Sequence, residues 1–502
     1  MKLRPDYPDA YFGAGLTFYA MGEWAKARSF FIVGLNKPFP DSIFVCNPRD
    51  YDYNPWYFMG LCAVQERKPK EALAWWAKCL RMTPEGERLR SQIKEVAAIQ
   101  RDLDLAEHAL ALAAAWKDAP ERVRALVDAM PPEMRSHSAI AKMRADVLPK
   151  TESSGKEIAI WCGNSWEEWD GTSLANGIGG SEEAVIRLSR IWAARGWQVT
   201  VFGSPGPIPK EIDGVTWRPF WEWSAGDKYD VFISWRDPII FSEEINAPMR
   251  LLDLHDVPMP DDYTPDRLAR ISRIMVKSAF HRKLLPKVPD EKFLIIGHGV
   301  DRGEFSPEWT YARYPLRIVS TSSYDRGIEH LLRRWPKIRA AVPDAELHLF
   351  YGWGLFNEMH KADAAKMAWQ KEMLALMQQA GVHEHGRVGQ DVLAGELRTS
   401  GIWAYPCHFP EIFCISAAKA QAAGCIPVVC LWESSLEEVV LDGVKVKGTP
   451  RDEAIADKYV DALIEALGKD VPEEGRAKLA VAALDRFDWE AVASRWEEAW
   501  KL

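Results

Sequence analysis

Residues 408–430, HFPEIFCISAAKAQAAGCIPVVC, constrain the fold of this chain more than any other stretch. The small residues at 416–423 predict a helix, and Gly424 ends it because glycine favours the backbone conformation that follows a helix. The apolar run 426–430 predicts a buried strand of a parallel sheet. Glu411 therefore stands just before a helix N-terminus, which attracts anions. This arrangement favours a ligand with hydroxyl groups for the carboxylate and phosphates for the helix end.

An alternation of buried strands and helices runs through residues 157–500, after a polar linker at 150–156. It predicts two α/β domains, 151–305 and 306–485, and a final segment, 486–502, that packs back toward the first domain. In such domains ligands bind at the carboxyl ends of the strands. The predicted strands are 157–162, 199–203, 230–234, 250–254, 274–277, 293–296, 317–322, 346–351, 402–405 and 426–430, and the predicted helices are 181–195, 328–341, 364–380, 416–423, 452–467, 473–487 and 489–500.

Residues 1–100 contain a sequence repeat, with 45 residues between equivalent positions. Small residues alternate with large ones at the spacing of paired helices, which resembles a tetratricopeptide repeat lengthened by an insert at 40–53. A generic pair of helical hairpins is the alternative. Residues 101–150 continue as a helical extension and linker, within predicted helices at 88–105, 106–116, 120–130 and 132–147. The repeated positions are Tyr11, Ala14, Gly15, Phe18, Ala27, Phe31 and Gly34 in the first copy, and Trp56, Met59, Gly60, Ala63, Ala72, Trp76, Cys79 and Pro84 in the second.

Composition favours a cytoplasmic globular protein. The net charge of −9 argues against nucleic-acid binding by general phosphate neutralisation, although a local basic patch would escape this average. The eight cysteines are scattered without a C-x-x-C pair, which is typical of free thiols in a reducing compartment. We find no signal peptide, and no apolar run approaches the ~18–20 residues of a membrane span.

Polar side chains follow two of the predicted strands. His255 and Asp256 come after strand 250–254, and Arg236 comes after strand 230–234. Since binding sites form at the carboxyl ends of parallel strands, we expect His255 to belong to a site rather than to a structural hydrogen bond.

A glycine pair and two tryptophans lie in the first βαβ unit. Gly179 and Gly180 open a helix that Ser181 is expected to cap, and such a helix start can bind an anion. A plain tight turn is the alternative. Trp166 and Trp169 precede this helix in a long loop, where they either stack on a bound acceptor or pack the loop against its own domain.

These motifs together resemble glycosyltransferases of the GT-B fold and of the retaining family-4 type. The resemblance covers about two-thirds of the chain. It implies two Rossmann-like domains that face each other across a cleft, with the acceptor on the first and a nucleotide-sugar on the second. The motifs that carry it are GIGGSEEAV, LLDLHDVP, GHGVDRGEFSP, STSSYDRGIEHLL, HFPEIFCISAAKAQAAGCIPVV and FDWEAVASRWEEAW.

The resemblance assigns roles residue by residue. It implies catalytic roles for His255, Glu411 and Arg326, with Arg326 at the position of a phosphate-binding lysine. No metal ion is expected, because cations and helix N-termini stabilise the leaving phosphate. The implied donor-binding residues are Gly179, Gly180, Ser322, Ser323, Arg326, Glu411, Ile412, Phe413, Cys414, Ile415 and Lys419, and the expected acceptor-binding residues are Trp166, Trp169, Ser181 and Asp256.

Two positions depart from the family pattern. Lys419 stands eight residues after Glu411, where the family has a second acid that holds the ribose hydroxyls. Our hypothesis is that Lys419 contacts a phosphate or a carboxylated donor. Ser322 and Ser323 stand near the place of the family's Gly-Arg pair.

Two hypotheses about function follow. The first is a retaining glycosyltransferase that uses a nucleoside-diphosphate sugar, with an unidentified acceptor such as a glycan, a protein, a small molecule or a modified nucleic acid. In this case the helical repeats recruit the acceptor or a protein partner. The second is a degenerate GT-B scaffold, which Lys419 supports and the intact His255, Arg326 and Glu411 oppose. A third, an epimerase or phosphorylase with the same fold, fits the family-4 spacing less well.

Overall fold

The structure, a computed structural model, describes residues 7–38, 49, 51–82, 87–116, 118–130, 138–147, 150, 152–305 and 312–500. The chain forms two compact units, Met1–Met143 and Arg144–Leu502. Most of the predicted insert, Pro84, linker residue 151 and the predicted domain boundary after residue 305 lie outside the described residues. No helix in the described ranges is long and apolar enough to span a bilayer.

The first unit is helical, as the sequence predicts. Helices α1 (Pro8–Ala20) and α2 (Trp24–Leu35) form one hairpin, and α3 (Tyr53–Gln65) and α4 (Pro69–Met82) form another. The unit continues with α5 (Glu87–Ala115) and α6 (Pro120–Ala129), and α8 (Ser138–Val147) contains the boundary with the second unit.

Close helix approach in both hairpins depends on glycine. A Cβ added at Gly34 would lie 2.4 Å from the ring of Phe12, and one at Gly60 would lie 2.1 Å from Trp76 Nε1. The same Trp76 nitrogen donates a hydrogen bond of 3.1 Å to the carbonyl of Tyr57. The alternation of small and large residues in the repeat therefore reflects direct packing of one helix against the next.

Helix α5 differs from the sequence prediction. We expected separate helices at 88–105 and 106–116, but α5 runs unbroken from Glu87 to Ala115. Residues 87–115 contain neither glycine nor proline, so nothing interrupts the backbone hydrogen bonds of the helix.

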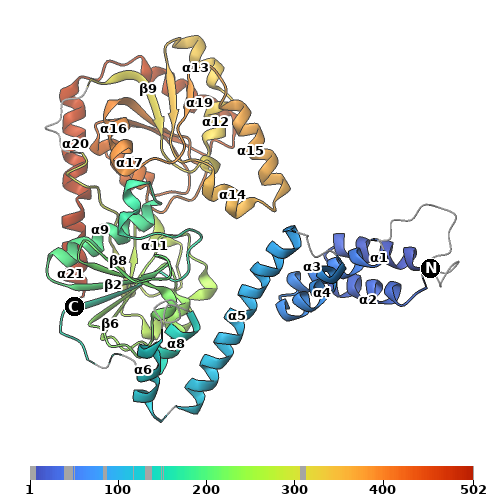
Figure 1. The fold of residues 1–502 in the computed structure, drawn as a ribbon. Coiled ribbons are helices and arrows are strands. Elements are labelled where there is room, and N and C mark those ends of the chain that lie inside the picture. Colours follow the sequence, from blue (N-terminus) through green and yellow to red (C-terminus); the bar gives the residue numbers. More distant parts are fainter. Residues whose placement is uncertain are drawn as a thin grey trace. The chain divides into compact units, whose positions relative to one another are not determined.

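The second unit contains two α/β domains, each with its own sheet (Figure 1). The first sheet has the order β3-β4-β2-β1-β5-β6-β7-β8, and all of its pairs are parallel except β3–β4. The hairpin β3–β4 was not predicted. The elements are β1 (Glu157–Trp161), α9 (Gly180–Ala194), β2 (Gln198–Gly203), β3 (Lys210–Ile212), β4 (Val215–Pro219), β5 (Val231–Trp235), β6 (Met249–Asp253), α10 (Pro265–Arg270), β7 (Arg273–Val276), α11 (Ala279–Lys283) and β8 (Phe293–Ile295).

The second sheet is wholly parallel, with the order β11-β10-β9-β12-β13-β14. Helices α12, α13, α15 and α19 cover one face, and α16, α17, α18 and α20 cover the other. The elements are β9 (Tyr314–Ser320), α12 (Ile328–Leu332), α13 (Trp335–Ala341), β10 (Glu346–Leu349), α14 (Gly354–His360), α15 (Ala364–Leu376), β11 (Val382–Glu384), α16 (Gln390–Thr399), β12 (Ser400–Tyr405), α17 (Ile415–Ala422), β13 (Ile426–Leu431), α18 (Leu436–Val439), β14 (Val444–Lys447), α19 (Glu453–Leu467), α20 (Glu473–Phe487) and α21 (Trp489–Ala499).

One predicted helix of this domain is broken in two. The sequence pattern predicted a single helix over 328–341, but α12 ends at Leu332 and α13 begins at Trp335. Pro336 lacks a backbone N–H and therefore favours the start of a helix over its interior. Each of the predicted strands lies within a few residues of a strand in the structure, whereas β11 and β14, like β3 and β4, were not predicted.

The chain passes between the two domains at two adjacent points. Val300, on the way out of the first domain, pairs with Asp488, on the way back. After this return α21 buries Val492 and Trp496 in the core of the first domain, beside Trp192 of α9. Figure 1 shows α20 along the second domain and α21 along the first.

Candidate active site

A cleft of about 930 Å³ separates the two α/β domains and is lined by both. Its walls are the carboxyl ends of the strands and the loops that follow them, which is where ligands of such sheets bind. Every residue that the sequence analysis proposed for catalysis, donor binding or acceptor binding lies in this wall: Trp166, Trp169, Gly179, Gly180, Ser181, His255, Asp256, Ser322, Ser323, Arg326, Glu411, Ile412, Phe413, Cys414, Ile415 and Lys419.

Glu411 and Arg326 form an ion pair on the wall of the second domain. Arg326 Nη1 donates to Glu411 Oε2 at 3.0 Å, and Tyr405 donates its hydroxyl to the same oxygen at 2.8 Å. Although burial opposes its charge, the Glu411 carboxylate raises the pKa of Arg326 above its ordinary value. Gly327, at φ 132°, follows Arg326, and a Cβ there would lie 2.0 Å from the carbonyl oxygen of Pro406. The loop that carries Arg326 is thus held tightly against the loop that leads to Glu411.

His255 is held on the wall of the first domain by a buried carboxylate. Its Nε2 lies 2.7 Å from Asp253 Oδ2, and Lys277 donates to the other oxygen of Asp253. Burial opposes the charge of Asp253, but His255 and Lys277 hold the pKa of this carboxyl below its usual value. The ionised carboxylate only accepts hydrogen bonds, so Nε2 of His255 carries the proton.

The second ring nitrogen of His255 is an unpartnered acceptor. Nδ1 is buried and has no hydrogen-bond partner among the described residues. Burial lowers the pKa of His255, and Asp253 offsets this only in part. The imidazole is therefore neutral near pH 7 and offers a lone pair on Nδ1. Neither Asp253 nor Lys277 was predicted, although Asp253, the last residue of β6, lies only two residues before His255.

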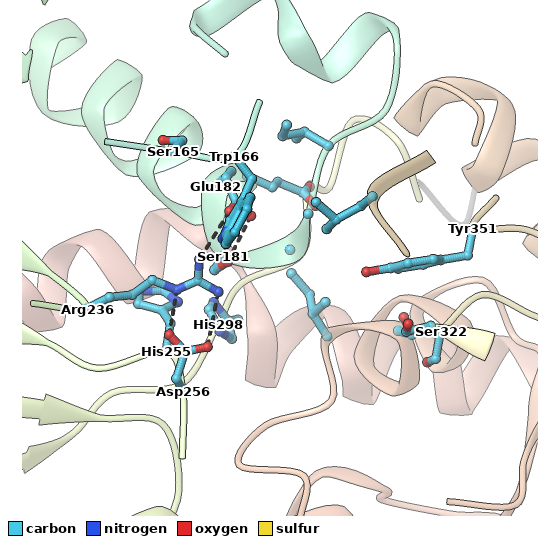
Figure 2. Close-up of a pocket in the computed structure, with 18 of the residues that line it drawn as sticks. Ser165, Trp166, Ser181, Glu182, Arg236, His255, Asp256, His298, Ser322 and Tyr351 are labelled. Atoms are coloured by element: carbon cyan, nitrogen blue, oxygen red, sulfur yellow. Dashed lines mark hydrogen bonds and ion pairs between the residues drawn. The ribbon is translucent and has the colours of Figure 1, made fainter. Parts of the chain in front are cut away.

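Arg236 joins two acidic groups beside His255. Its guanidinium lies 3.3 Å from Glu182 Oε1 and 2.8 Å from Asp256 Oδ2, and Figure 2 shows it between these two side chains. Arg236 has a φ of 70°, which is uncommon for a residue with a side chain. Its guanidinium also stacks on Trp235 at 4.4 Å. The polar residue predicted at the end of this strand thus positions Asp256 and the start of α9.

Lys419 faces the first domain rather than an open ligand site. Its Nζ lies 2.6 Å from Glu183 Oε2 and 2.6 Å from Gln390 Oε1. Only 4% of Lys419 and 1% of Glu183 are exposed. The partner of Lys419 in the structure thus differs from the phosphate or carboxylated donor of our hypothesis. Its ammonium forms an ion pair that connects the two domains.

The glycine pair brings α9 close to the second domain. Gly179 is the N-cap of α9, and a Cβ at Gly180 would lie 2.7 Å from Ile415 Cγ2. The expectation that Ser181 caps this helix is wrong, because Ser181 lies within it and donates its hydroxyl to Glu182. The glycines thus permit contact between α9 and the start of α17.

The two loop tryptophans differ in their exposure. Trp166 is 75% exposed at the cleft, whereas Trp169 is 3% exposed. Trp169 packs edge-on against Trp217 and donates its indole N–H to Ser165 Oγ at 2.9 Å. Trp166 is available to a ligand, and Trp169 holds the loop against its own domain.

Comparison with known proteins agrees with this architecture. No protein-family model matches the sequence. The phosphatidyl-myo-inositol mannosyltransferase of Mycobacterium tuberculosis (strain CDC 1551 / Oshkosh) is 23% identical over 367 residues, which cover 63% of this chain and 91% of that protein. The protein of the same name from Mycobacterium leprae is 27% identical over 207 residues, which cover 40% of this chain and 50% of that protein.

Solved structures share the fold at lower identity. Sucrose-phosphate synthase from Thermosynechococcus elongatus has a TM-score of 0.52 and 15% identity, and covers 69% of this chain and 98% of its own. A glycosyltransferase from Rickettsia africae ESF-5 has a TM-score of 0.52 and 14% identity, and covers 70% of this chain and 98% of its own. The two-sheet architecture is therefore the GT-B fold.

Proposed function

We propose that this chain, which has the GT-B fold and is similar over 63% of its length to a mannosyltransferase, is a family-4-type glycosyltransferase whose cleft transfers a sugar from a nucleoside diphosphate to an acceptor with retention of anomeric configuration. The observation that carries this proposal is the composition of the cleft wall. His255 from the first domain and Arg326 and Glu411 from the second line one cavity.

The second domain supplies the groups for the donor. Arg326 stabilises the charge that develops on the leaving diphosphate, and Glu411 accepts hydrogen bonds from the hydroxyl groups of the donor sugar. Tyr405 orients Glu411 through the hydrogen bond to Oε2. With charge stabilisation supplied by side chains and by the N-terminus of α17, the transfer itself proceeds without a metal ion.

The first domain supplies the groups for the reacting centre and the acceptor. Nδ1 of His255 accepts a hydrogen bond from a sugar hydroxyl, because its lone pair is otherwise unused. Trp166, Ser181 and Asp256 form the acceptor side of the cleft, with Trp166 as a flat surface for a sugar ring.

Lys419 changes how the nucleotide is held. Two of the three N–H donors of its ammonium are used by Glu183 and Gln390. We infer that the ammonium serves the contact between the domains, so that the ribose hydroxyls are held without the carboxylate that the family has at this position.

The names of the relatives suggest which sugar donor to test first. The Mycobacterium proteins are named as mannosyltransferases that act on phosphatidyl-myo-inositol. For this chain we propose nucleoside-diphosphate mannose as the first donor to test, and a hydroxyl group as the acceptor. The buried free thiols of the described chain fit the cytoplasm, where nucleotide-sugar transfer would occur.

A donor panel tests this function. The full chain is incubated with nucleoside-diphosphate mannose, glucose and N-acetylglucosamine, and both donor hydrolysis and the melting temperature are measured. We expect one donor to be hydrolysed slowly and to raise the melting temperature, and NMR of the product to report the donor's own anomer. The Glu411→Gln variant should lose hydrolysis, while Glu437→Gln, on the exposed part of α18, should retain it.

The same panel tests the alternative that the chain is a scaffold with a degenerate cleft. Neither hydrolysis nor a shift in melting temperature with any donor would support that alternative. A product of inverted anomeric configuration would support transferase activity and overturn the proposed retention.

A further inference from the structure

Three side chains outside the cleft wall converge behind the loop that carries Arg326. Glu329 and His330 lie in the first turn of α12, and His408 lies in the loop after β12. His330 Nε2 lies 2.9 Å from His408 Nδ1. Glu329 Oε1 lies 3.7 Å from the first of these atoms and 3.6 Å from the second. One carboxylate oxygen and two ring nitrogens therefore form a compact triangle.

Two of the three sides of this triangle are close to those of a metal site, and the third, between the two ring nitrogens, is ~0.4 Å shorter than a bound ion requires. With metal–ligand bonds of ~2.0–2.2 Å in a tetrahedral arrangement, neighbouring ligand atoms lie about 3.3–3.6 Å apart. The side chains of Glu329 and His330 are each 12% exposed, and that of His408 is 9% exposed. The set is thus shielded, and its ligands need little movement to reach a common ion.

The surroundings of the three side chains also fit metal ligation. The other ring nitrogen of His408 lies 3.2 Å from the carbonyl oxygen of Asp325, which is the kind of hydrogen bond that commonly orients a metal-ligating histidine. Glu329 Oε2 is buried and has no hydrogen-bond partner among the described residues. Among the described residues Glu329 forms no ion pair with an arginine or lysine, and a cation at the triangle would supply a direct partner.

Arg333 and Arg334, near the triangle, are engaged elsewhere, and Arg451 contributes the other nearby arginine charge. Arg333 pairs with Glu372, and Arg334 pairs with Asp457 and with Glu453. The carboxylates of those pairs neutralise these two guanidinium groups, so they do not take the place of an ion at Glu329.

We propose that Glu329, His330 and His408 bind a divalent transition metal ion of the zinc class, with water as the fourth ligand. Two imidazoles and one carboxylate are a donor set that zinc accepts. The backbone N–H of His408 donates to the carbonyl of Arg326 at 3.1 Å. The ion would therefore fasten α12 and the loop after β12 to the Arg326 loop from behind, and it takes no part in sugar transfer.

A second, looser cluster provides a comparison within the same domain. Glu346, His348 and His383 place one ligand atom each within 4.8 Å of the others. Glu346 and His383 are both exposed, and His383 lies on the edge strand β11. We expect this cluster to bind a metal ion more weakly than the triangle at Glu329.

The test is a titration of the metal-free full chain with Zn²⁺, followed by calorimetry, and with Co²⁺, followed by the visible absorption of a tetrahedral complex. We expect one tight site per chain. His330→Ala and Glu329→Gln should weaken this site at least about tenfold, as ligand-shell changes commonly do. Glu329→Gln keeps the shape of the side chain, so it separates loss of ligation from loss of fold.

His383→Ala is the matched control, since it removes a histidine from the looser cluster and should leave the tight site unchanged. Zinc should also raise the melting temperature of the wild type and of His383→Ala, and raise that of Glu329→Gln by less. The proposal is overturned if no tight site is present, or if His383→Ala removes the site while His330→Ala leaves it intact.

Discussion

The charged and polar groups in and around the cleft are of two kinds, buried pairs and accessible groups. The buried pairs are Lys419 with Glu183 and Lys277 with Asp253, and each of these four residues is at most 4% exposed. The accessible groups include the Arg326 side chain, 34% exposed, and Trp166, 75% exposed. A substrate can reach the second kind without opening the protein. We infer that the two buried pairs hold the cleft together, while the accessible groups meet the substrate together with His255 and Glu411, which are buried but line the cleft.

The largest expected effect comes from breaking the buried pair between the domains. Lys419→Met leaves Glu183 as a buried carboxylate with only Arg187, 3.6 Å away, to offset it. Losing one partner of such a pair typically costs about 3–5 kcal/mol. We expect a lower melting temperature for the unit 144–502, measured by calorimetry on the full chain.

The double variant Lys419→Met with Glu183→Gln is the control for this prediction. It removes both charges and should recover much of the loss, because a buried pair as a whole contributes little net stability. If the single variant were as stable as the wild type, Lys419 would not connect the domains, and its family position would again be open to the donor.

Removal of an accessible group should affect catalysis more than stability. Arg326→Ala is expected to lower kcat about 10²–10³-fold, or ~2.7–4 kcal/mol, because the charge on the leaving diphosphate loses its partner. Steady-state transfer with the donor found in the panel measures this. Arg333→Ala, which removes an exposed arginine paired with Glu372, is the matched control and should leave kcat unchanged. An equal loss in both variants would assign Arg326 a structural role.

This division explains what the sequence could predict. Strand ends and glycine turns fix which residues line the cleft, so His255, Arg326 and Glu411 were found from local patterns and family resemblance. The partners of these groups were missed. Glu183 reaches Lys419 across 236 positions of sequence, and no local pattern records such a contact. The unbroken helix α5 is a different kind of error, because local apolar spacing divided it in two although no glycine or proline interrupts it.

Low pH should lower the stability of the folded protein through the buried histidines near His255. Burial, helped by Lys277, lowers the pKa of His281 to about 3 from 6.5. Below about pH 6.5 the unfolded chain binds a proton that the folded chain excludes, so stability falls by ~1.4 kcal/mol per pH unit for this histidine until about pH 3. Melting temperatures between pH 4 and 7 measure the slope. It should be shallower in His281→Asn and unchanged in His108→Asn, which alters an exposed histidine of the first unit.

The smallest expected free-energy change is that of Trp166→Ala. It contrasts with the change expected for the nearby Trp169→Ala. Stacking of an exposed aromatic ring on a ligand contributes about 0.5–1.5 kcal/mol, so Trp166→Ala should raise the acceptor KM by up to about tenfold at constant kcat and stability. Trp169→Ala, three residues further along the same loop, removes a buried ring packed against Trp217 and should cost ~3–5 kcal/mol of stability. Acceptor kinetics and unfolding measured on both variants would therefore separate the two kinds of residue within one loop. If Trp166→Ala lowered stability and left KM unchanged, exposure at the cleft would not identify the groups that meet the substrate.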